Sequence, residues 1–363
     1  MMIAVTARKA LEKRYGAQGY QQIRTALQAY AEVAGARLIA LDDADDMNQP
    51  DLQLPPAGGT GPGALLLSMR AVRTVLGNVD SILLVGGDNI VPYWQITNPV
   101  TDRGIDPDLN VLSDNPYGTN TESLEEYLAP PLAVGRLTDF PRGSVADFVQ
   151  LINATTASRQ ARSARNSSAA VVNADWSDFS RHASNALPAP DWHLSPGYLL
   201  DGTRRADADR EFLYFNLHGF DGVAEWKGYD NVQDRFVAAV TPDAFDQQYV
   251  SGSVVFAENC YGAQTVGRTP SNSCALRLVR EGAAFVGATG LAFGSHLAPN
   301  FFLEDADALT HSFWREFVSG VALGEALRQA RAAYLGDANA PETNTFKQKT
   351  LLQFVLLGDP GWN

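Results

Sequence analysis

The chain has 363 residues, of which 45% are hydrophobic and 19% are charged, so it is long enough to bury a large core. Its net charge of −13 and isoelectric point of about 4.8 argue against partners such as nucleic acids or anionic membranes. It contains two cysteines and no apolar stretch of about 18 residues, which excludes a disulfide framework and argues against a membrane span.

The first half of the chain alternates short apolar runs with amphipathic segments, a pattern typical of α/β folds with a mainly parallel sheet. Strands are predicted at residues 3–5, 37–41, 81–85 and 132–135. Helices are predicted at residues 19–34, 64–76 and 144–158. The stretch 90–130 is rich in Asp, Asn, Pro and Gly and lacks clear periodicity. We therefore expect a functional loop there, or one that carries small elements of its own.

A second pattern of the same kind begins after the polar segment 159–168, which has no apolar face. Its strands are predicted at residues 169–172, 211–217, 253–257 and 283–286. Its helices are predicted at residues 179–187, 271–280, 305–318 and 321–335. We therefore predict an N-terminal α/β subdomain, residues 1–160, and a C-terminal subdomain, residues 161–363.

Two apolar runs of the second half end in side chains that can perform acyl transfer. One ends in His218-Gly219, and the other ends in Cys260. If the two runs are neighbouring parallel strands, the imidazole and the thiol emerge at the same edge of the sheet. The histidine could then activate the thiol or protonate a leaving amine. The backbone N–H groups of Gly219 and Cys260 could bind a developing oxyanion.

Other cysteine and histidine residues have simpler explanations. Composition alone favours two buried, unreactive thiols, and Cys274 lies in a predicted helix where a core position is expected. His182 follows Asp178 by four residues, which is typical of a pair on one helix face. His296 follows a glycine-rich loop and either lines the same cleft or lies on the surface. No metal-ligand spacing and no dinucleotide or Walker motif is present, so no metal and no cofactor is expected.

The chain resembles the gingipain-type cysteine endopeptidases, part of a group that includes caspases, legumain, clostripain and separase. The group hallmark is an apolar strand ending in His-Gly and a later strand ending in Cys, here His218-Gly219 and Cys260. Further segments that are similar to gingipains follow in the family's order along nearly the whole chain, at residues 84–92, 113–118, 134–137, 224–226 and 357–360.

The resemblance implies a caspase-like α/β/α sandwich with a mainly parallel sheet and two side-by-side subdomains, the second being catalytic. It implies a Cys-His dyad with Cys260 as nucleophile, His218 as acid and base, and the Gly219 and Cys260 N–H groups as oxyanion hole. By analogy with the family, Asp175 would orient the histidine. Asp178 would give the primary specificity pocket a preference for Arg at P1, the residue before the cleaved bond.

Four more residues are expected to bind substrate: Trp226, Glu258, Phe293 and Ser295. Trp226 and Phe293 would be pocket walls, although buried aromatic residues belong to a core more often than not. Arg181 would instead favour an acidic P1 residue if it faced the pocket.

The expected activity is limited cleavage of protein or peptide substrates through a thioester acyl-enzyme. The N-terminal residues show no secretory signal, and a free thiol suits a reducing compartment, so a cytoplasmic enzyme is expected. A mobile loop, a regulatory protein partner or internal cleavage would restrain it; segment 159–168 is either a self-cleavage site or a solvated linker. Two alternatives stay open, a non-catalytic caspase-like scaffold module and a transpeptidase or ligase with the same dyad.

Overall fold

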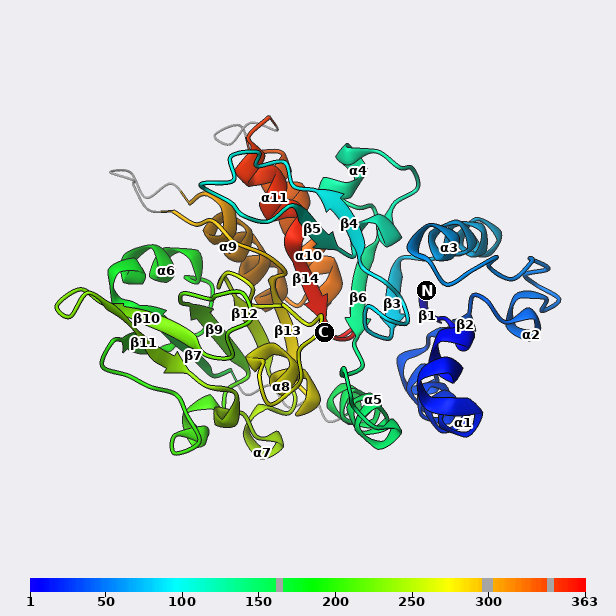
Figure 1. The fold of residues 1–363 in the computed structure, drawn as a ribbon, viewed down its shortest axis with the longest axis horizontal. Coiled ribbons are helices and arrows are strands. Elements are labelled where there is room, and N and C mark those ends of the chain that lie inside the picture. Colours follow the sequence, from blue (N-terminus) through cyan, green and yellow to red (C-terminus); the bar gives the residue numbers. More distant parts are fainter. Residues whose placement is uncertain (161–165, 296–302, 338–342) are drawn as a thin grey trace.

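The computed structural model describes residues 1–160, 166–295, 303–337 and 343–363 (Figure 1). Its main feature is a ten-stranded sheet with helices on both faces, which confirms the predicted α/β sandwich with a mainly parallel sheet. His296 and the middle of segment 159–168 lie outside the described residues. The sheet is continuous through both halves of the chain, and the division between residues 160 and 161 stays a prediction.

The strand order in the sheet is β2-β1-β3-β6-β14-β13-β12-β9-β7-β8. The strands have the bounds β1 (Met2–Thr6), β2 (Arg37–Ala40), β3 (Ser81–Val85), β6 (Ala133–Leu137), β7 (Ser168–Asn173), β8 (Asp191–Ser195), β9 (Phe212–Asn216), β12 (Val254–Ala257), β13 (Ala284–Ala288) and β14 (Phe354–Leu357). β14 pairs parallel with β6 and antiparallel with β13, whereas every other pair is parallel. The strands of the first half, together with β14, therefore run opposite to the other strands of the second half, and the carboxyl ends of the two sets lie at opposite edges.

The central strands of the second half bury side chains on both faces, which explains why each reads as a continuous apolar run. Leu213 and Phe215 belong to the core that includes helix α8 (Cys274–Arg280). The alternate residues Tyr214 and Phe256 belong to the opposite core, beneath α9 (Asp305–Val318) and α10 (Leu323–Leu335). This alternation produces the three layers visible in Figure 1.

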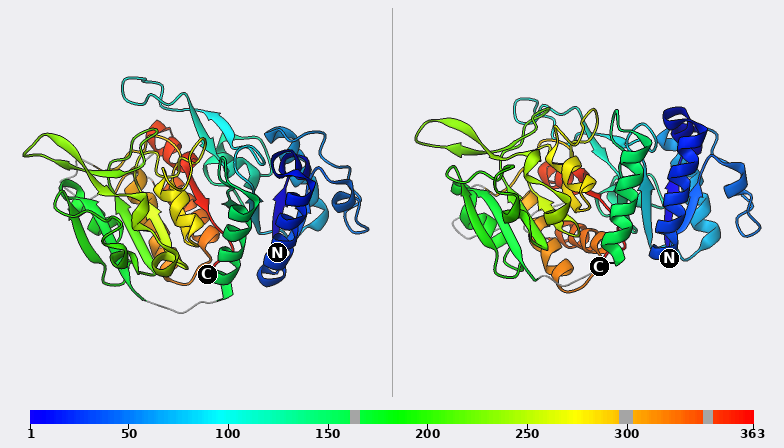
Figure 2. Two further views of the ribbon diagram at one scale, coloured as in Figure 1. Left: turned by 60° about the horizontal axis from the view of Figure 1, so that its bottom comes forward. Right: turned by 90° about the horizontal axis from the view of Figure 1, so that it is seen from below.

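Helix α1 (Arg8–Ala34) lies against α5 (Val145–Gln160), as Figure 2 shows from below. α1 begins at Arg8, well before the predicted start at residue 19. The helix is kinked at Gly16, where φ is 73°, and the prediction covered only the part after this kink. The glycine interrupts the helical periodicity on which the prediction depended. The remaining helices are α2 (Ala44–Met47), α3 (Pro62–Leu76), α4 (Leu124–Leu128), α6 (Ser177–Ala183), α7 (Gln247–Val250), α11 (Thr345–Gln353) and the short 3₁₀ turns η1 (Asn115–Gly118), η2 (Ala174–Trp176), η3 (Arg205–Ala208) and η4 (Pro242–Ala244).

The aperiodic stretch after β3 carries small elements of its own, including the antiparallel pair β4 (Trp94–Thr97) and β5 (Asn110–Ser113). It crosses to the other half of the molecule, where the Ser113 hydroxyl donates a 2.6 Å hydrogen bond to the Leu352 carbonyl in α11. Residues of the N-terminal half thereby reach the edge at which β9, β12 and β13 end.

A fully buried ion pair holds this crossing stretch to the sheet. The Arg136 guanidinium on β6 binds the Asp114 carboxylate, with an Nε–Oδ2 distance of 2.9 Å. Its Nη1 also donates to the carbonyls of Gly86 (2.7 Å) and Val91 (2.6 Å), and its plane lies over the Tyr93 ring. One side chain therefore satisfies two backbone carbonyls of the loop after β3 and joins that loop to Asp114.

Replacing Arg136 by Met should lower the free energy of unfolding by about 3–5 kcal/mol, because Asp114 would stay buried without its cation. Replacing Arg37, whose partner Asp51 is largely exposed, should cost less than about 1 kcal/mol. Urea denaturation of both variants measures the difference. Equal losses would contradict the role assigned to the buried pair.

Candidate active site

The two strands that carry the predicted dyad are parallel neighbours. β9 and β12 pair in register, with Phe215 opposite Ala257. Beyond the strands, the Leu217 N–H donates to the Asn259 side chain at 3.0 Å, which keeps the two chains together past the last ladder bond. His218 and Cys260 therefore leave the sheet at the same edge, as the sequence predicts.

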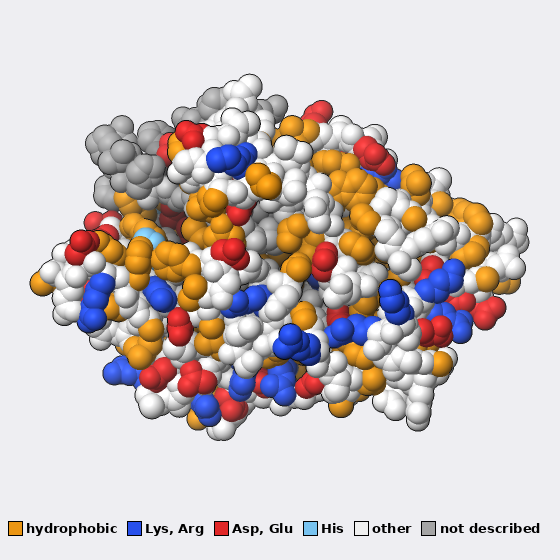
Figure 3. Space-filling view, in the orientation of Figure 1, with side chains coloured by type: hydrophobic (Ala, Val, Ile, Leu, Met, Phe, Trp, Pro, Cys, Tyr) orange, Lys and Arg blue, Asp and Glu red, His pale blue; other side chains and the backbone are white. Residues whose placement is uncertain are grey.

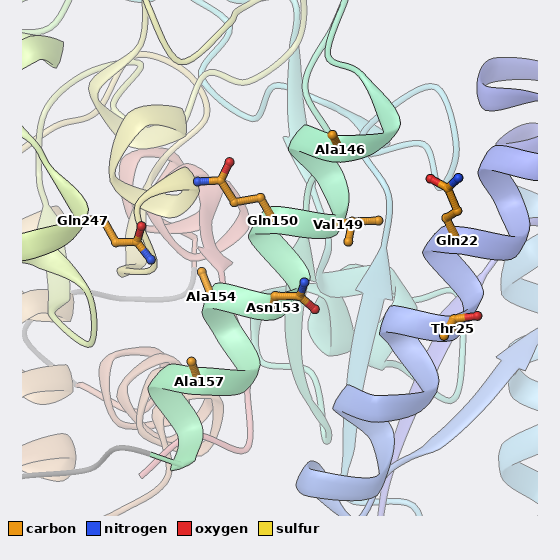
Figure 4. A pocket seen from close by; sticks show the side chains of 9 residues that line it. All are labelled: Gln22, Thr25, Ala146, Val149, Gln150, Asn153, Ala154, Ala157 and Gln247. Atoms are coloured by element: carbon orange, nitrogen blue, oxygen red, sulfur yellow. The ribbon is translucent and has the colours of Figure 1, made fainter.

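His218 and Cys260 line one cavity of about 220 Å³ at this edge. The cavity is formed by the ends of β9 and β12, the 3₁₀ turn η2, the loop after β13 and the start of α9. Its lining residues are Trp176, Asn216, Leu217, His218, Glu258, Cys260, Ala292, Phe293, Gly294, Ser295, Ala306 and Asp307. A larger open groove of about 770 Å³ runs over α5, with α1 on one side and Gln247 of α7 on the other (Figure 4). Its lining residues carry no ionisable groups, so it is not a candidate for this chemistry.

Gly219 packs directly on the backbone of Cys260. A Cβ atom on Gly219 would lie 1.8 Å from the Cys260 carbonyl oxygen, so every other residue would force the two segments apart. The two segments therefore pack together through their main chains, and the side chains of His218 and Cys260 line the same cavity. The expected pairing of their N–H groups as an oxyanion hole stays a prediction.

The Cys260 side chain is partly exposed and is held by the loop after β13. The Ala292 N–H donates to the Cys260 sulfur at 3.4 Å, and the thiol can donate to the Ala292 carbonyl at the same distance. Burial raises the pKa of the Cys260 thiol above its ordinary value, and the Ala292 N–H opposes this shift only in part.

The His218 imidazole lies between aromatic rings. The ring centroids of Trp176 and Phe236 are 4.3 Å and 4.9 Å from it. Burial lowers the pKa of His218 below its ordinary value, while the charge of Asp175 acts in the opposite direction. The Asp175 carboxylate accepts two hydrogen bonds, at 2.7 and 2.8 Å, from the Asn231 amide. No hydrogen bond joins Asp175 to the His218 ring in the described part of the chain, so its predicted orienting role stays a prediction.

The two pKa shifts favour the same resting state. A raised thiol pKa and a lowered imidazole pKa stabilise the neutral Cys260–His218 pair relative to a thiolate–imidazolium pair. If His218 takes the thiol proton, this transfer would accompany substrate binding rather than precede it.

Two buried carboxyl groups meet at the inner wall of the cavity. The Tyr214 hydroxyl donates to Glu258 at 2.6 Å, and the Ser295 N–H donates to the Asp307 Oδ2 atom at 2.6 Å. The Asp307 Oδ1 atom has no hydrogen-bond donor among the described residues. Burial and the neighbouring carboxylate raise the pKa of Glu258 well above its usual range, and burial raises the pKa of Asp307 to about 6. The pair therefore holds a proton near neutral pH.

A buried cation from the C-terminal half supports the loops around Cys260. Lys349 of α11 is fully buried, and its ammonium forms ion pairs with Asp106 and Asp108, the latter at 2.8 Å. The Asp108 carboxylate also accepts hydrogen bonds from the Tyr261 hydroxyl (2.9 Å) and the Leu291 N–H (2.7 Å). The crossing stretch of the N-terminal half therefore holds both segments between which the Cys260 sulfur lies.

The structure places the other predicted residues as follows. Glu258, Phe293 and Ser295 line the cavity. Trp226 is buried in the core and does not line it, because its large apolar ring stacks on Phe285. Asp178 is exposed on α6 and does not line it either.

Cys274 is buried, as expected for a core residue. Arg181 lies over the ring of Trp192 and outside the lining of the cavity.

Sequence reasoning missed Asp307, Trp176 and Ala292. One signal for Asp307 was present, because it shares helical spacing with Thr310 and Trp314, both of which are buried in α9. An acid in line with core positions of a predicted helix indicates a special environment. Ala292 contributes only backbone groups to Cys260, which no side-chain pattern can reveal.

The geometry can be compared with known proteins. The family model described as peptidase family C25 matches residues 5–363. A crystal structure of the Arg-specific cysteine proteinase gingipain R matches with a TM-score of 0.63 and 13% identity, covering 99% of this chain and 77% of that one. A structure described as that of a protease matches with a TM-score of 0.57 and 12% identity, with the same coverage of both chains. Among curated proteins nothing matches significantly. No described helix is both long and apolar enough to cross a bilayer.

The neutral resting pair predicts how Cys260 reacts with iodoacetamide. The alkylation rate should keep rising with pH beyond about 8.5, the ordinary thiol pKa, because the thiolate forms late. A Cys260→Ala variant reports the contribution of Cys274, which should be small because that thiol is buried. A rate that levels off below about pH 7 would instead reveal a preformed thiolate–imidazolium pair.

Proposed function

The chain belongs to peptidase family C25, the gingipain family of cysteine peptidases, and we propose that it is an endopeptidase that cleaves proteins after basic residues. One observation carries the proposal. The Cys260 thiol and the His218 imidazole open into a single cavity whose inner wall is a pair of carboxyl groups, Glu258 and Asp307.

The proposed reaction follows from the positions of these groups. His218 accepts the proton of the Cys260 thiol as the sulfur attacks the scissile carbonyl carbon, and the Gly219 and Cys260 N–H groups stabilise the oxyanion. His218 then donates that proton to the leaving amine, and the acyl group stays on sulfur as a thioester. Water hydrolyses the thioester, with His218 again taking the proton. The neutral resting pair supports this order, because His218 begins as a base.

The carboxyl pair of Glu258 and Asp307 supports the proposal that the P1 side chain is cationic. A guanidinium or ammonium near Glu258 and Asp307 favours their ionised forms, which burial alone disfavours. The Asp307 Oδ1 atom has no donor among the described residues but is itself buried, so it would accept a hydrogen bond from the substrate only after a small shift of the cavity wall. Binding of such a side chain would release the proton that the pair holds, so the affinity should rise with pH as Glu258 and Asp307 lose it.

Three further expectations stay predictions: a cytoplasmic location, control by a regulatory protein partner, and self-cleavage within 159–168. Arg162 and Arg165 lie outside the described residues. Arg159 is part of α5, and its guanidinium contacts the Asp359 carboxylate at 2.5 Å. Cleavage after Arg159 would require this ion pair to open.

Glu258→Gln should lower kcat/KM for peptides with Arg at P1 on the order of 100-fold, since a charged hydrogen-bond acceptor contributes about 1.5–3 kcal/mol. The exposed Asp178 provides the matched control, and Asp178→Asn should change the same constant by less than about twofold. Cleavage of a P1-randomised peptide library by the wild type and both variants measures the effect.

Cys260→Ala, assayed in parallel, reports any contaminating peptidase. Alkylation of Cys260 by iodoacetamide shows whether the Glu258→Gln site is still intact. A basic preference that is lost in Asp178→Asn and kept in Glu258→Gln would contradict the assignment of the carboxyl pair.

A further inference from the structure

An aromatic patch lies beside His218 outside the cavity. It consists of Phe220, Tyr229 and Phe236, of which the last two belong to the hairpin β10 (Trp226–Asp230) and β11 (Arg235–Val240). The Phe236 ring is 4.8 Å from Phe220, 5.1 Å from Tyr229 and 4.9 Å from His218, centroid to centroid. None of the three lines the cavity that holds Cys260.

The patch is open to solvent. Phe236 is 45% exposed, and its two partners are partly exposed. Figure 3 shows hydrophobic side chains on the face of the molecule that carries α6 and the β10–β11 hairpin. Clustered exposed aromatic rings are unfavourable in water, and such clusters commonly mark binding surfaces.

The hairpin that carries the patch is firmly held. His218 and Lys227 exchange two backbone hydrogen bonds of 2.8 Å, and the Tyr229 N–H donates to the Asn173 side chain at 2.9 Å. Gly228 packs so closely on Ser195 that a Cβ atom would lie 2.0 Å from the Ser195 hydroxyl oxygen. The aromatic rings therefore have fixed positions relative to the imidazole.

The position of the patch relative to the reaction identifies its ligand. His218 must reach the leaving nitrogen to protonate it, so the chain that begins at that nitrogen passes His218. With the P1 side chain in the cavity, as proposed above, the two rings against His218 mark two sides: Trp176 lines the cavity and Phe236 does not, so a leaving segment that passes His218 away from the cavity would meet the patch. Charged groups stand at the edge of the patch rather than between its rings: Lys227 lies over the Phe220 ring and pairs with Glu225 at 4.0 Å, and the Tyr229 hydroxyl donates a hydrogen bond to Asp234.

We propose that the aromatic patch is a subsite for a bulky apolar side chain at P1′ or P2′, the first two residues after the cleaved bond. The inference rests on the proposed function, because it needs the acyl-enzyme on Cys260. It adds a second determinant of specificity, so that the preferred cleavage sites combine a basic residue with a following apolar residue.

Acyl transfer tests the subsite separately from P1 binding. A blocked arginine methyl ester acylates Cys260 and releases methanol, which leaves no P1′ residue. Added leucine amide or glycine amide then competes with water: the amine attacks the thioester carbon, its proton passes to His218, and a peptide bond replaces the carbon–sulfur bond. Leucine amide should trap the acyl-enzyme about tenfold more efficiently than glycine amide, as expected for partial burial of its side chain.

Phe236→Ala should remove most of this preference, and Phe236→Leu should restore part of it; the readout is the ratio of trapping by the two amides, which cancels any change in acylation rate caused by exposing His218. Val232→Ala is the control, because Val232 lies in the same hairpin but is 95% exposed and outside the patch. Equal trapping by both amides in the wild type, or an unchanged preference in Phe236→Ala, would overturn the subsite while leaving the peptidase proposal intact. Failure to hydrolyse the ester at all would overturn both.

Discussion

The parallel pairing of β9 with β12 is the constraint on which the site depends. Phe215 lies opposite Ala257, and His218 and Cys260 each follow three residues later, so both reach the sheet edge at the same level. A side chain at position 219 would collide with the Cys260 carbonyl, so the close approach of the two segments requires a glycine there. The ion pairs of Lys349 with Asp106 and Asp108 then hold the surrounding loops in place from the other half of the molecule.

Burial sets the protonation states of the site. It raises the pKa of the thiol and of the two carboxyl groups and lowers that of the imidazole, so each of these shifts favours the uncharged form. Without substrate, these four groups therefore favour their uncharged forms. In the proposed reaction, a cationic side chain would favour ionisation of the carboxyl pair, and the thiol proton would pass to His218 as the sulfur attacks the scissile carbonyl carbon. The same burial would therefore serve both specificity and restraint.

The sequence predicts the parts of this arrangement that depend on side-chain pattern. The apolar runs locate β3, β9 and β12 closely, and the residues that follow β9 and β12 identify the dyad segments. Three features could not be read in this way. The reversal of strand direction at β14 depends on which strands pair, the hairpin β10–β11 has no strong apolar alternation, and Trp226 fills the core rather than the cavity. The stretch 90–130 was expected either to be functional or to carry small elements of its own. Its contact with the site could not be predicted, because the hydrogen bond that the Tyr261 hydroxyl donates to Asp108 joins residues far apart in the chain.

Labelling with a peptidyl acyloxymethyl ketone that carries Arg at P1 tests the dyad most directly. Mass spectrometry of the wild type should find one adduct, on Cys260, and His218→Ala should form it on the order of 100-fold more slowly, because the base that accepts the thiol proton is gone. An adduct on another residue, or an equal rate in His218→Ala, would contradict the account.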